Sequence, residues 1–226
     1  MEPSAPCARW RRRKSARPSE ILAAALASFA ERGFAATRLE DVAARAGITK
    51  GTLYLYFRSK EELFKAVVRQ QLVPTIAAAE ALVEESEEPS AVLLERLLLR
   101  WAGLAATPVS ALPKLILTEA GNFPDLARFY LEEVAGRGLA LLQHLIERGV
   151  ARGEFGPIDT AAAARCVVAP MLLIMLWRHS FEPHEQHPID PVTFCRTHIA
   201  LVTRGLASAT AAASPPESES RHEPAK

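Results

Sequence analysis

The segment 47–63, GITKGTLYLYFRSKEEL, constrains this chain more than any other, because it is compatible with two local structures. Its centre, LYLYF, is rich in aromatic residues with a spacing of two, which is typical of a short β-strand. Its flanks indicate helices: Thr49 can cap one helix, and Ser59 with Glu62 matches the Ser-x-x-Glu capping box that opens another. A strand would find no partner strand in this chain, so the sequence favours a helix with Leu53 and Phe57 on its buried face.

The residues before this segment predict two further helices. The first ends at Gly33 and has one apolar helical face, made by Ile21, Leu22, Ala25, Leu26 and Phe29. The second begins at a capping box of Thr37 and Glu40 and ends at Gly47. A helix, a glycine-containing turn and a short helix, backed by a preceding helix, predict a helix-turn-helix domain over residues 18–65.

The charge is divided unevenly along the chain. Residues 1–69 carry 14 Lys and Arg against 7 Asp and Glu, whereas residues 70–226 carry the other 13 against 19. A basic amino-terminal part, residues 1–69, followed by an acidic remainder predicts a polyanionic partner for the amino-terminal part alone. Residues 1–17 have the composition of a disordered basic arm. At the other end of the chain, residues 211–226 have the composition of a disordered tail.

Residues 66–210 read as a helical bundle with long apolar stripes, and the fold class predicted for the whole chain is all-α. Large apolar side chains suited to line a cavity for a hydrophobic ligand are Trp101, Phe123, Phe129, Met171, Met175 and Trp177. The last two long helices, about 160–180 and 191–208, are apolar on more faces than one bundle needs, which predicts a homodimer built through them.

Other functions find little support in the sequence. The most apolar window, 166–177, is too short to span a bilayer, and the three cysteines have no disulfide or metal spacing. The histidines at 179, 184 and 187, with nearby acids, match no strong metal motif, and no catalytic motif is found. We therefore expect a cytoplasmic protein that is not an enzyme, with no metal and no cofactor.

The stretch AATRLEDVAARAGITKGTLYLYFRSKEELFKAVV resembles the DNA-binding signature of the tetracycline-repressor (TetR) family over roughly residues 18–65. The resemblance implies a homodimer that binds double-stranded DNA at a palindromic operator and is released by a small effector, here an unknown and hydrophobic one. The DNA-contacting positions that it implies are Thr37, Arg38, Thr49, Lys50, Gly51, Thr52, Tyr54, Leu55, Tyr56 and Lys60.

Several alternatives stay open from the sequence. The side chain of Leu55 can meet a thymine methyl group or pack on the DNA backbone. Tyr54 and Tyr56 can be packing residues, and Lys50 and Lys60 can be merely solvated. A constitutive helix-turn-helix protein without an effector is the alternative to a ligand-responsive repressor. The fourth helix, from Ser59 towards Leu72, joins the two domains and is the expected lever between them.

Overall fold

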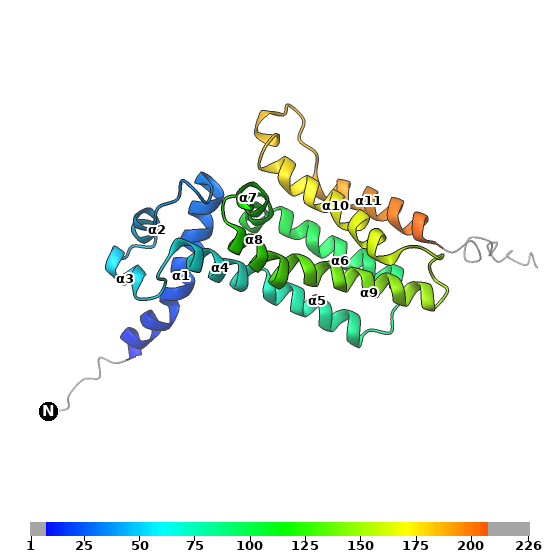
Figure 1. The fold of residues 1–226 in the computed structure, drawn as a ribbon, viewed down its shortest axis with the longest axis horizontal. Coiled ribbons are helices and arrows are strands. Elements are labelled where there is room, and N and C mark those ends of the chain that lie inside the picture. Colours follow the sequence, from blue (N-terminus) through cyan, green and yellow to red (C-terminus); the bar gives the residue numbers. More distant parts are fainter. Residues whose placement is uncertain (1–7, 208–226) are drawn as a thin grey trace, which may run out of the picture.

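The computed structural model describes residues 8–207, in which helices are joined by turns and loops and the only β-structure is one isolated antiparallel bridge between Phe155 and Ala207. The helices of the amino-terminal head are α1 (Ala8–Arg32), α2 (Leu39–Arg45), α3 (Lys50–Tyr54) and α4 (Lys60–Gln71). The helices of the body are α5 (Val73–Glu85), α6 (Ser90–Ala105), α7 (Ala111–Glu119), α8 (Pro124–Tyr130), α9 (Gly136–Ala151), α10 (Thr160–Arg178) and α11 (Pro191–Leu206). Figure 1 shows α2 and α3 at one end of an elongated molecule and the long body helices at the other.

The expected arrangement of the head is confirmed. Gly33 and Gly47, which follow α1 and α2, have φ angles of 82° and 65°, a region that glycine enters without a steric penalty. Segment 50–57 contains no strand: α3 ends at Tyr54, and both Leu53 and Phe57 are buried. α1 begins at Ala8, well before the expected boundary at residue 18, while residues 1–7 of the expected arm and the tail 211–226 lie outside the described residues.

The capping box predicted at Thr37 is wrong. Arg38 is the N-cap of α2, without a side-chain cap, and Thr37 is 2% exposed. The Thr37 hydroxyl donates instead to the carbonyl oxygens of Gly33 at 2.6 Å and Ser28 at 3.2 Å. Thr37 therefore fastens the turn after α1 and does not cap the next helix.

The second capping box is present in altered form. The Ser59 hydroxyl accepts from the backbone N–H of Glu62 at 3.1 Å, as expected. The Glu62 carboxylate, however, accepts from the backbone N–H of Arg58 at 2.8 Å. This arrangement still pairs two amides that would otherwise be free at the start of α4.

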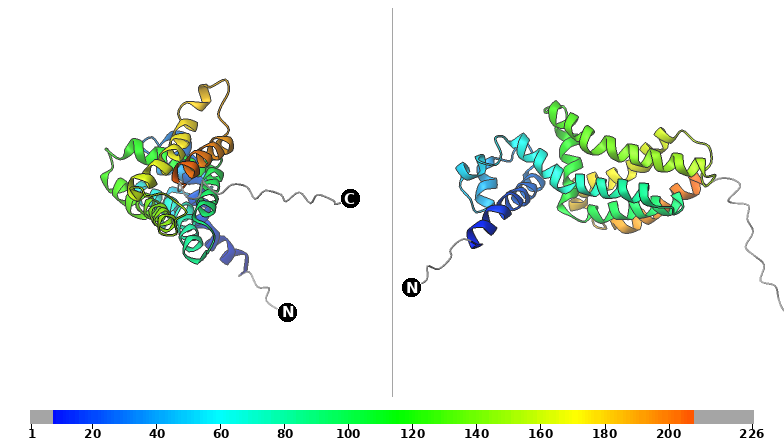
Figure 2. Two further views of the ribbon diagram at one scale, coloured as in Figure 1. Left: turned by 90° about the vertical axis from the view of Figure 1, so that its right-hand side faces the viewer. Right: turned by 90° about the horizontal axis from the view of Figure 1, so that it is seen from below.

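The body has its own core, between α5, α6, α9, α10 and α11, which pack against one another. The right view of Figure 2 shows long helices of the body along their length. The head shares its core with α7 and α8, because Leu112, Leu115, Ile116, Leu126 and Phe129 pack among the side chains of α1 and α4. Phe34 of the head stacks edge-on against Phe123, with ring centroids 4.9 Å apart. The boundary expected at residues 65 and 66 thus lies inside α4 and is bridged by α7 and α8.

A five-residue π-helical segment, η2 (Leu131–Ala135), joins α8 to α9. The backbone N–H of Gly136 bonds to the carbonyl of Leu131, which closes a turn wider than that of an α-helix. A Cβ atom at Gly136 would lie 2.8 Å from the Leu131 carbonyl oxygen, so the turn leaves no room for a side chain at this position.

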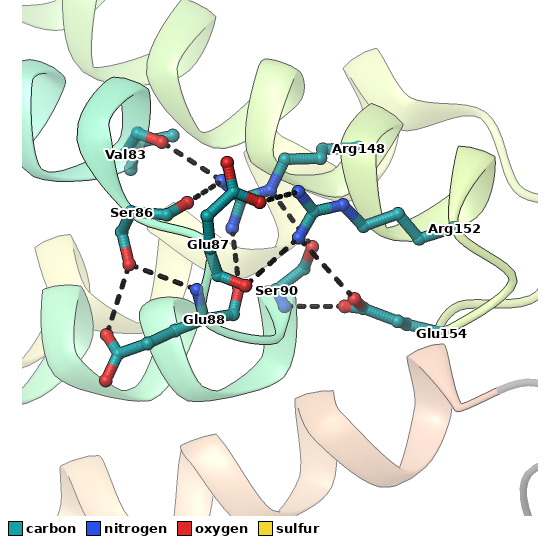
Figure 3. Close-up of polar contacts among 8 residues, drawn as sticks. All are labelled: Val83, Ser86, Glu87, Glu88, Ser90, Arg148, Arg152 and Glu154. Atoms are coloured by element: carbon teal, nitrogen blue, oxygen red, sulfur yellow. Dashed lines mark hydrogen bonds and ion pairs between the residues drawn. The ribbon is translucent and has the colours of Figure 1, made fainter.

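At the far end of the body, the guanidinium group of Arg148 on α9 holds the connection between α5 and α6 (Figure 3). It donates to the carbonyl oxygens of Val83 and Ser86, both at 3.0 Å, and of Glu88 at 3.1 Å. These bonds satisfy carbonyls that the end of α5 leaves unpaired. Nearby, the Glu154 carboxylate accepts from the backbone N–H of Ser90 at 2.5 Å.

The helix α10 is longer than the apolar window that the sequence suggested. With 19 residues and a mean hydropathy of 1.8, it is long and apolar enough to cross a membrane, a property that core helices of soluble proteins share. In this fold α10 packs against α6, α7, α9 and α11, and its buried face includes Val167, Met171, Ile174 and Met175.

Candidate nucleic-acid interface and ligand cavity

The amino terminus of α3 is exposed at the tip of the head, and its cap is the one expected. The Thr49 side chain accepts from the backbone N–H of Thr52 at 3.2 Å, and the two threonine hydroxyls lie 2.9 Å apart. Lys50 and Gly51, the first residues of the helix, are both exposed. A helix that presents its amino terminus in this way offers positive dipole ends and polar groups to a nucleic acid.

Lys50 has a partner that the sequence did not indicate. Its ammonium group is ion-paired with the carboxylate of Glu40 on α2, and it lies 5.8 Å from the centre of the Tyr54 ring. The hydrogen bond to Glu40 raises the pKa of Lys50, and the same bond lowers the pKa of Glu40. Both side chains are more than half exposed, so the pair can open at small cost when Lys50 meets another anion.

Three large side chains at the end of α3 differ in exposure. Leu55 is 83% exposed and Tyr54 is 43% exposed, so both can contact another molecule directly. Tyr56 is half-buried and packs against the core of the head. The packing alternative considered for the two tyrosines therefore describes Tyr56 and not Tyr54.

The basic residues around α3 are not equally available. The Lys60 ammonium donates to the carbonyl oxygens of Phe34 at 2.8 Å and Ala35 at 2.9 Å, so it ties α4 to the turn after α1. By contrast, the guanidinium groups of Arg38 and Arg58 are exposed, and neither has a hydrogen bond or ion pair with any described side chain. Arg58 was missed from the sequence, although a basic residue directly before a helix cap was a usable signal.

The glycine at position 51 leaves space that the protein itself does not use. A Cβ atom there would lie 4.0 Å from the Thr49 hydroxyl oxygen, an ordinary contact, and the backbone needs no unusual φ angle. The fold of the protein itself therefore does not require glycine at position 51. A glycine here is consistent with a surface that another molecule approaches closely.

The body encloses a cavity of about 420 Å³, a size typical of small-molecule sites. Its wall is almost entirely apolar and comes mainly from α5, α6, α7, α8, α9, α10 and the π-helical segment η2. Trp101 and Met175, both expected to line a cavity, contribute to this wall.

The other four expected lining residues lie elsewhere. Met171 is fully buried in the core of the body, and Phe129 is buried in the core of the head, beneath Lys65 and Arg69. Phe123 packs on Phe34, and the indole N–H of Trp177 donates to the Glu185 carboxylate at 2.9 Å. Leucine is the commonest of the apolar side chains that form the wall instead, and the sequence could not distinguish these leucines from ordinary core residues.

A few polar groups face the cavity. The Ser110 hydroxyl donates to the Thr107 carbonyl at 2.7 Å and lies 2.8 Å from the Nε2 atom of His179. Burial lowers the pKa of His179, and the charges of Arg178 and Lys114 lower it further. Burial also raises the pKa of Tyr130, which lines the cavity with a neutral hydroxyl that can donate a hydrogen bond.

Cys195 and His198, a thiol and an imidazole on the same helix, α11, are buried and take part in packing contacts of the body. The Cys195 thiol bonds to the carbonyl of Leu98 at 3.4 Å, and the His198 ring lies 2.9 Å from the carbonyl of Val167. In the part of the chain that the structure describes, no group of three or more His, Cys, Asp or Glu side chains is placed to hold a metal ion.

The cavity and the head are joined by shared residues. Leu72 at the end of α4 and Ile116 on α7 both line the cavity and belong to the core of the head. One turn beyond Ile116, the Glu119 carboxylate accepts from the backbone N–H of Ala35, in the turn before α2, at 3.2 Å. Helix α7 thus contacts the cavity on one side and the head on the other.

An exposed helix-turn-helix joined to a cavity-bearing helical body defines a class of proteins, the helix-turn-helix transcriptional regulators. Two family models match this chain: bacterial regulatory proteins of the tetR family over residues 21–67, and the tetracyclin repressor-like C-terminal domain over residues 91–192. The chain belongs to the TetR family of DNA-binding transcription regulators.

Individual relatives agree with this assignment. The HTH-type transcriptional regulator RutR of Escherichia coli K12 is 35% identical over 159 residues, which cover 64% of this chain and 67% of RutR. The HTH-type transcriptional repressor KstR2 of Rhodococcus jostii is 28% identical over 86% of this chain and 93% of its own. The structure of the regulator FadR from Bacillus subtilis in complex with stearoyl-CoA has the same fold, with a TM-score of 0.70 at 20% identity, over 83% of this chain and 98% of FadR.

Proposed function

We propose that this protein is a ligand-responsive repressor that acts in the cytoplasm. It binds an inverted-repeat DNA operator as a homodimer and is released by a small, hydrophobic effector. The observation that carries the proposal is the apolar cavity, whose wall includes residues of the core of the head. A bound acyl ligand in a protein of the same fold, FadR, supports a hydrophobic effector.

At the DNA, α3 enters the major groove in this proposal, with Lys50, Tyr54 and Leu55 toward the base edges. Arg38 and Arg58 neutralise phosphates on either side, since both are exposed and neither guanidinium group has a hydrogen bond or ion pair with a described residue, whereas the buried hydroxyl of Thr37 has no part. Lys60 acts mainly by holding the turn that positions α2. Lys50 must exchange its partner Glu40 for the DNA, which makes Glu40 a competitor of the operator.

For the homodimer we propose the outer faces of α10 and α11. The exposed side of α10 has small residues at helical spacing, Ala162, Cys166 and Ala169, followed by Leu173, which is 52% exposed. Small residues let two helices approach closely, and the neighbouring α11 adds Leu201, which is 67% exposed. A two-fold axis at this face would bury the most exposed large hydrophobic side chain of each helix, Leu173 and Leu201.

The variant Leu173→Glu is expected to convert the dimer to a monomer, because it would place two carboxylates close together in a desolvated apolar interface. Sedimentation velocity at micromolar concentration measures the change. Leu55→Glu introduces the same charge on the exposed end of α3 and should stay dimeric. An unchanged dimer in Leu173→Glu would place the interface elsewhere.

Release is proposed to work through both α4 and α7. A ligand can change DNA affinity only if it binds two arrangements of the body unequally, and a tenfold change requires about 1.4 kcal/mol of coupling. A ligand against Ile116 and Leu72 presses on the two helices that also pack in the head. The Glu119 bond to Ala35 then transmits a shift of α7 to the turn before α2.

The decisive experiment is selection of bound DNA from a random pool, followed by a ligand screen with the selected DNA. We expect an inverted repeat, with affinity that falls steeply as salt rises. Lipophilic compounds that raise the melting temperature should also release the DNA. Ligands that stabilise the protein and leave DNA affinity unchanged would favour the constitutive alternative, and a pool without any enriched sequence would contradict DNA recognition itself.

A further inference from the structure

We propose that the ligand of the body cavity is an anionic amphiphile, a hydrocarbon chain with one carboxylate or phosphate group, and that Arg100 on α6 binds the anion. This inference rests on the proposed function and specifies its ligand. Among the described residues that line the cavity, Arg100 alone carries a charge. The wall therefore offers an apolar surface for the hydrocarbon chain of a ligand and a single cation for its anionic head group.

The charge of Arg100 is unpaired, unlike those of its neighbours. Arg96, one turn earlier on α6, is ion-paired with Glu88, and Arg137 on α9 is paired with Glu80 at 2.5 Å. Arg148 is taken up by three carbonyl oxygens. Arg100 has no hydrogen bond or ion pair with any described residue, and no described acid lines the cavity.

The position of Arg100 supports a role at the entrance of the cavity. Of the described residues that line the cavity, only Arg100, Leu117 and Leu131 are exposed, so these three mark where the cavity meets solvent. An amphiphile in such a cavity keeps its chain inside and its charged group at the opening. There a guanidinium group can form two parallel hydrogen bonds to a carboxylate or a phosphate.

An alternative explanation is that Arg100 only covers the apolar wall with its hydrocarbon stem while its charge stays in water. The variant Arg100→Met separates the two explanations, because it keeps a long apolar stem and removes the charge. Arg100→Lys keeps a charge without the planar fork. Arg96→Met removes a guanidinium group one turn away that does not line the cavity and serves as the matched control.

The test is titration calorimetry of the full-length protein, without DNA, with three ligands of equal chain length: dodecanoate, dodecan-1-ol and dodecanoyl-CoA. We expect the wild type to bind dodecanoate at least about tenfold more tightly than the alcohol, from a charge-assisted hydrogen bond. Arg100→Met should abolish this preference, Arg100→Lys should keep part of it, and Arg96→Met should keep it entirely.

The thioester identifies the source of the anion. Tighter binding of dodecanoyl-CoA than of dodecanoate, lost in Arg100→Met, assigns the bound anion to a phosphate, and the reverse order assigns it to a carboxylate; both support the proposal. Equal affinity of the wild type for all three ligands would overturn it, as would a preference for an anionic ligand that survives in Arg100→Met. In either case the hydrophobic effector of the proposed function would stand. Failure of all three ligands to bind would remove both proposals.

Discussion

The variant Gly51→Ala is expected to lose DNA binding while it folds at least as stably as the wild type. A methyl group at this position has room inside the protein, with its nearest neighbour at 4.0 Å. Alanine also favours a helix over glycine by up to about 1 kcal/mol. At the DNA, however, the added methyl group separates α3 from the backbone or base that it approaches, and we expect at least a tenfold loss, about 1.4 kcal/mol.

Gly103→Ala is the matched control for this substitution. Gly103 lies on α6, is exposed, and a Cβ atom there would meet no described atom within 4 Å outside its own helix. The variant Gly103→Ala should raise the melting temperature as Gly51→Ala does, and it should leave DNA binding unchanged. Fluorescence anisotropy with the selected DNA, together with thermal unfolding, measures both properties. DNA binding at full strength by Gly51→Ala would contradict a close approach at the start of α3.

The variant Arg148→Met should destabilise the body by roughly 3 kcal/mol, because it leaves three partly buried carbonyl oxygens without their charged donor. The methionine stem keeps most of the packing along α9. Arg148→Lys should recover only part of the loss, since one ammonium group cannot match the planar fork that reaches Val83, Ser86 and Glu88 (Figure 3). Urea unfolding followed by circular dichroism gives the change.

Arg152→Met is the comparison for Arg148. The Arg152 guanidinium group also reaches the connection before α6, but its nearest partner, at 3.2 Å, is a Glu87 carboxylate that is 95% exposed, and the Glu87 carbonyl at 3.5 Å and the Glu154 carboxylate at 4.0 Å are more distant. An exposed pair of this kind contributes about 0.2–1 kcal/mol. Equal losses in the two variants would mean that the carbonyl contacts of Arg148 contribute no more than a surface ion pair.

The architecture of the head followed from local rules that act within a few residues. The cap at Thr49, the glycine turn at Gly47 and the i, i+4 pair of Leu53 and Phe57 each depend on neighbours along the chain. The all-α fold was therefore predictable, even though the alternation of Leu and Tyr suggested a strand. The error at Thr37 has the same origin, because the same hydroxyl found better acceptors behind it, in the turn after α1.

Features that depend on contacts distant in sequence could not be predicted. The ion pair of Lys50 with Glu40 joins two helices, and the hydrogen bond of Lys60 to Phe34 joins α4 to the turn after α1, so no spacing in the sequence indicates either contact. The cavity presents the same difficulty, because only two of six expected residues line it. A leucine stripe has the same pattern whether it faces a core or a void, and the difference depends on how the helices are spaced.

The π-helical segment between α8 and α9 has a consequence for how relatives of this protein can diverge. Such a turn holds one residue more than an α-helix would, and loss of a single codon would restore regular α-helix. Because the wider turn already takes up the extra residue, α8 and α9 would keep nearly the same rotation about the helix axis. Only the turn itself would narrow, and Gly136 would be released from the Leu131 carbonyl. Since Leu131, Val134 and Ala135 of this turn line the cavity, a change in the length of the gene by three bases could thus reshape one side of the cavity while the long helices keep their packing.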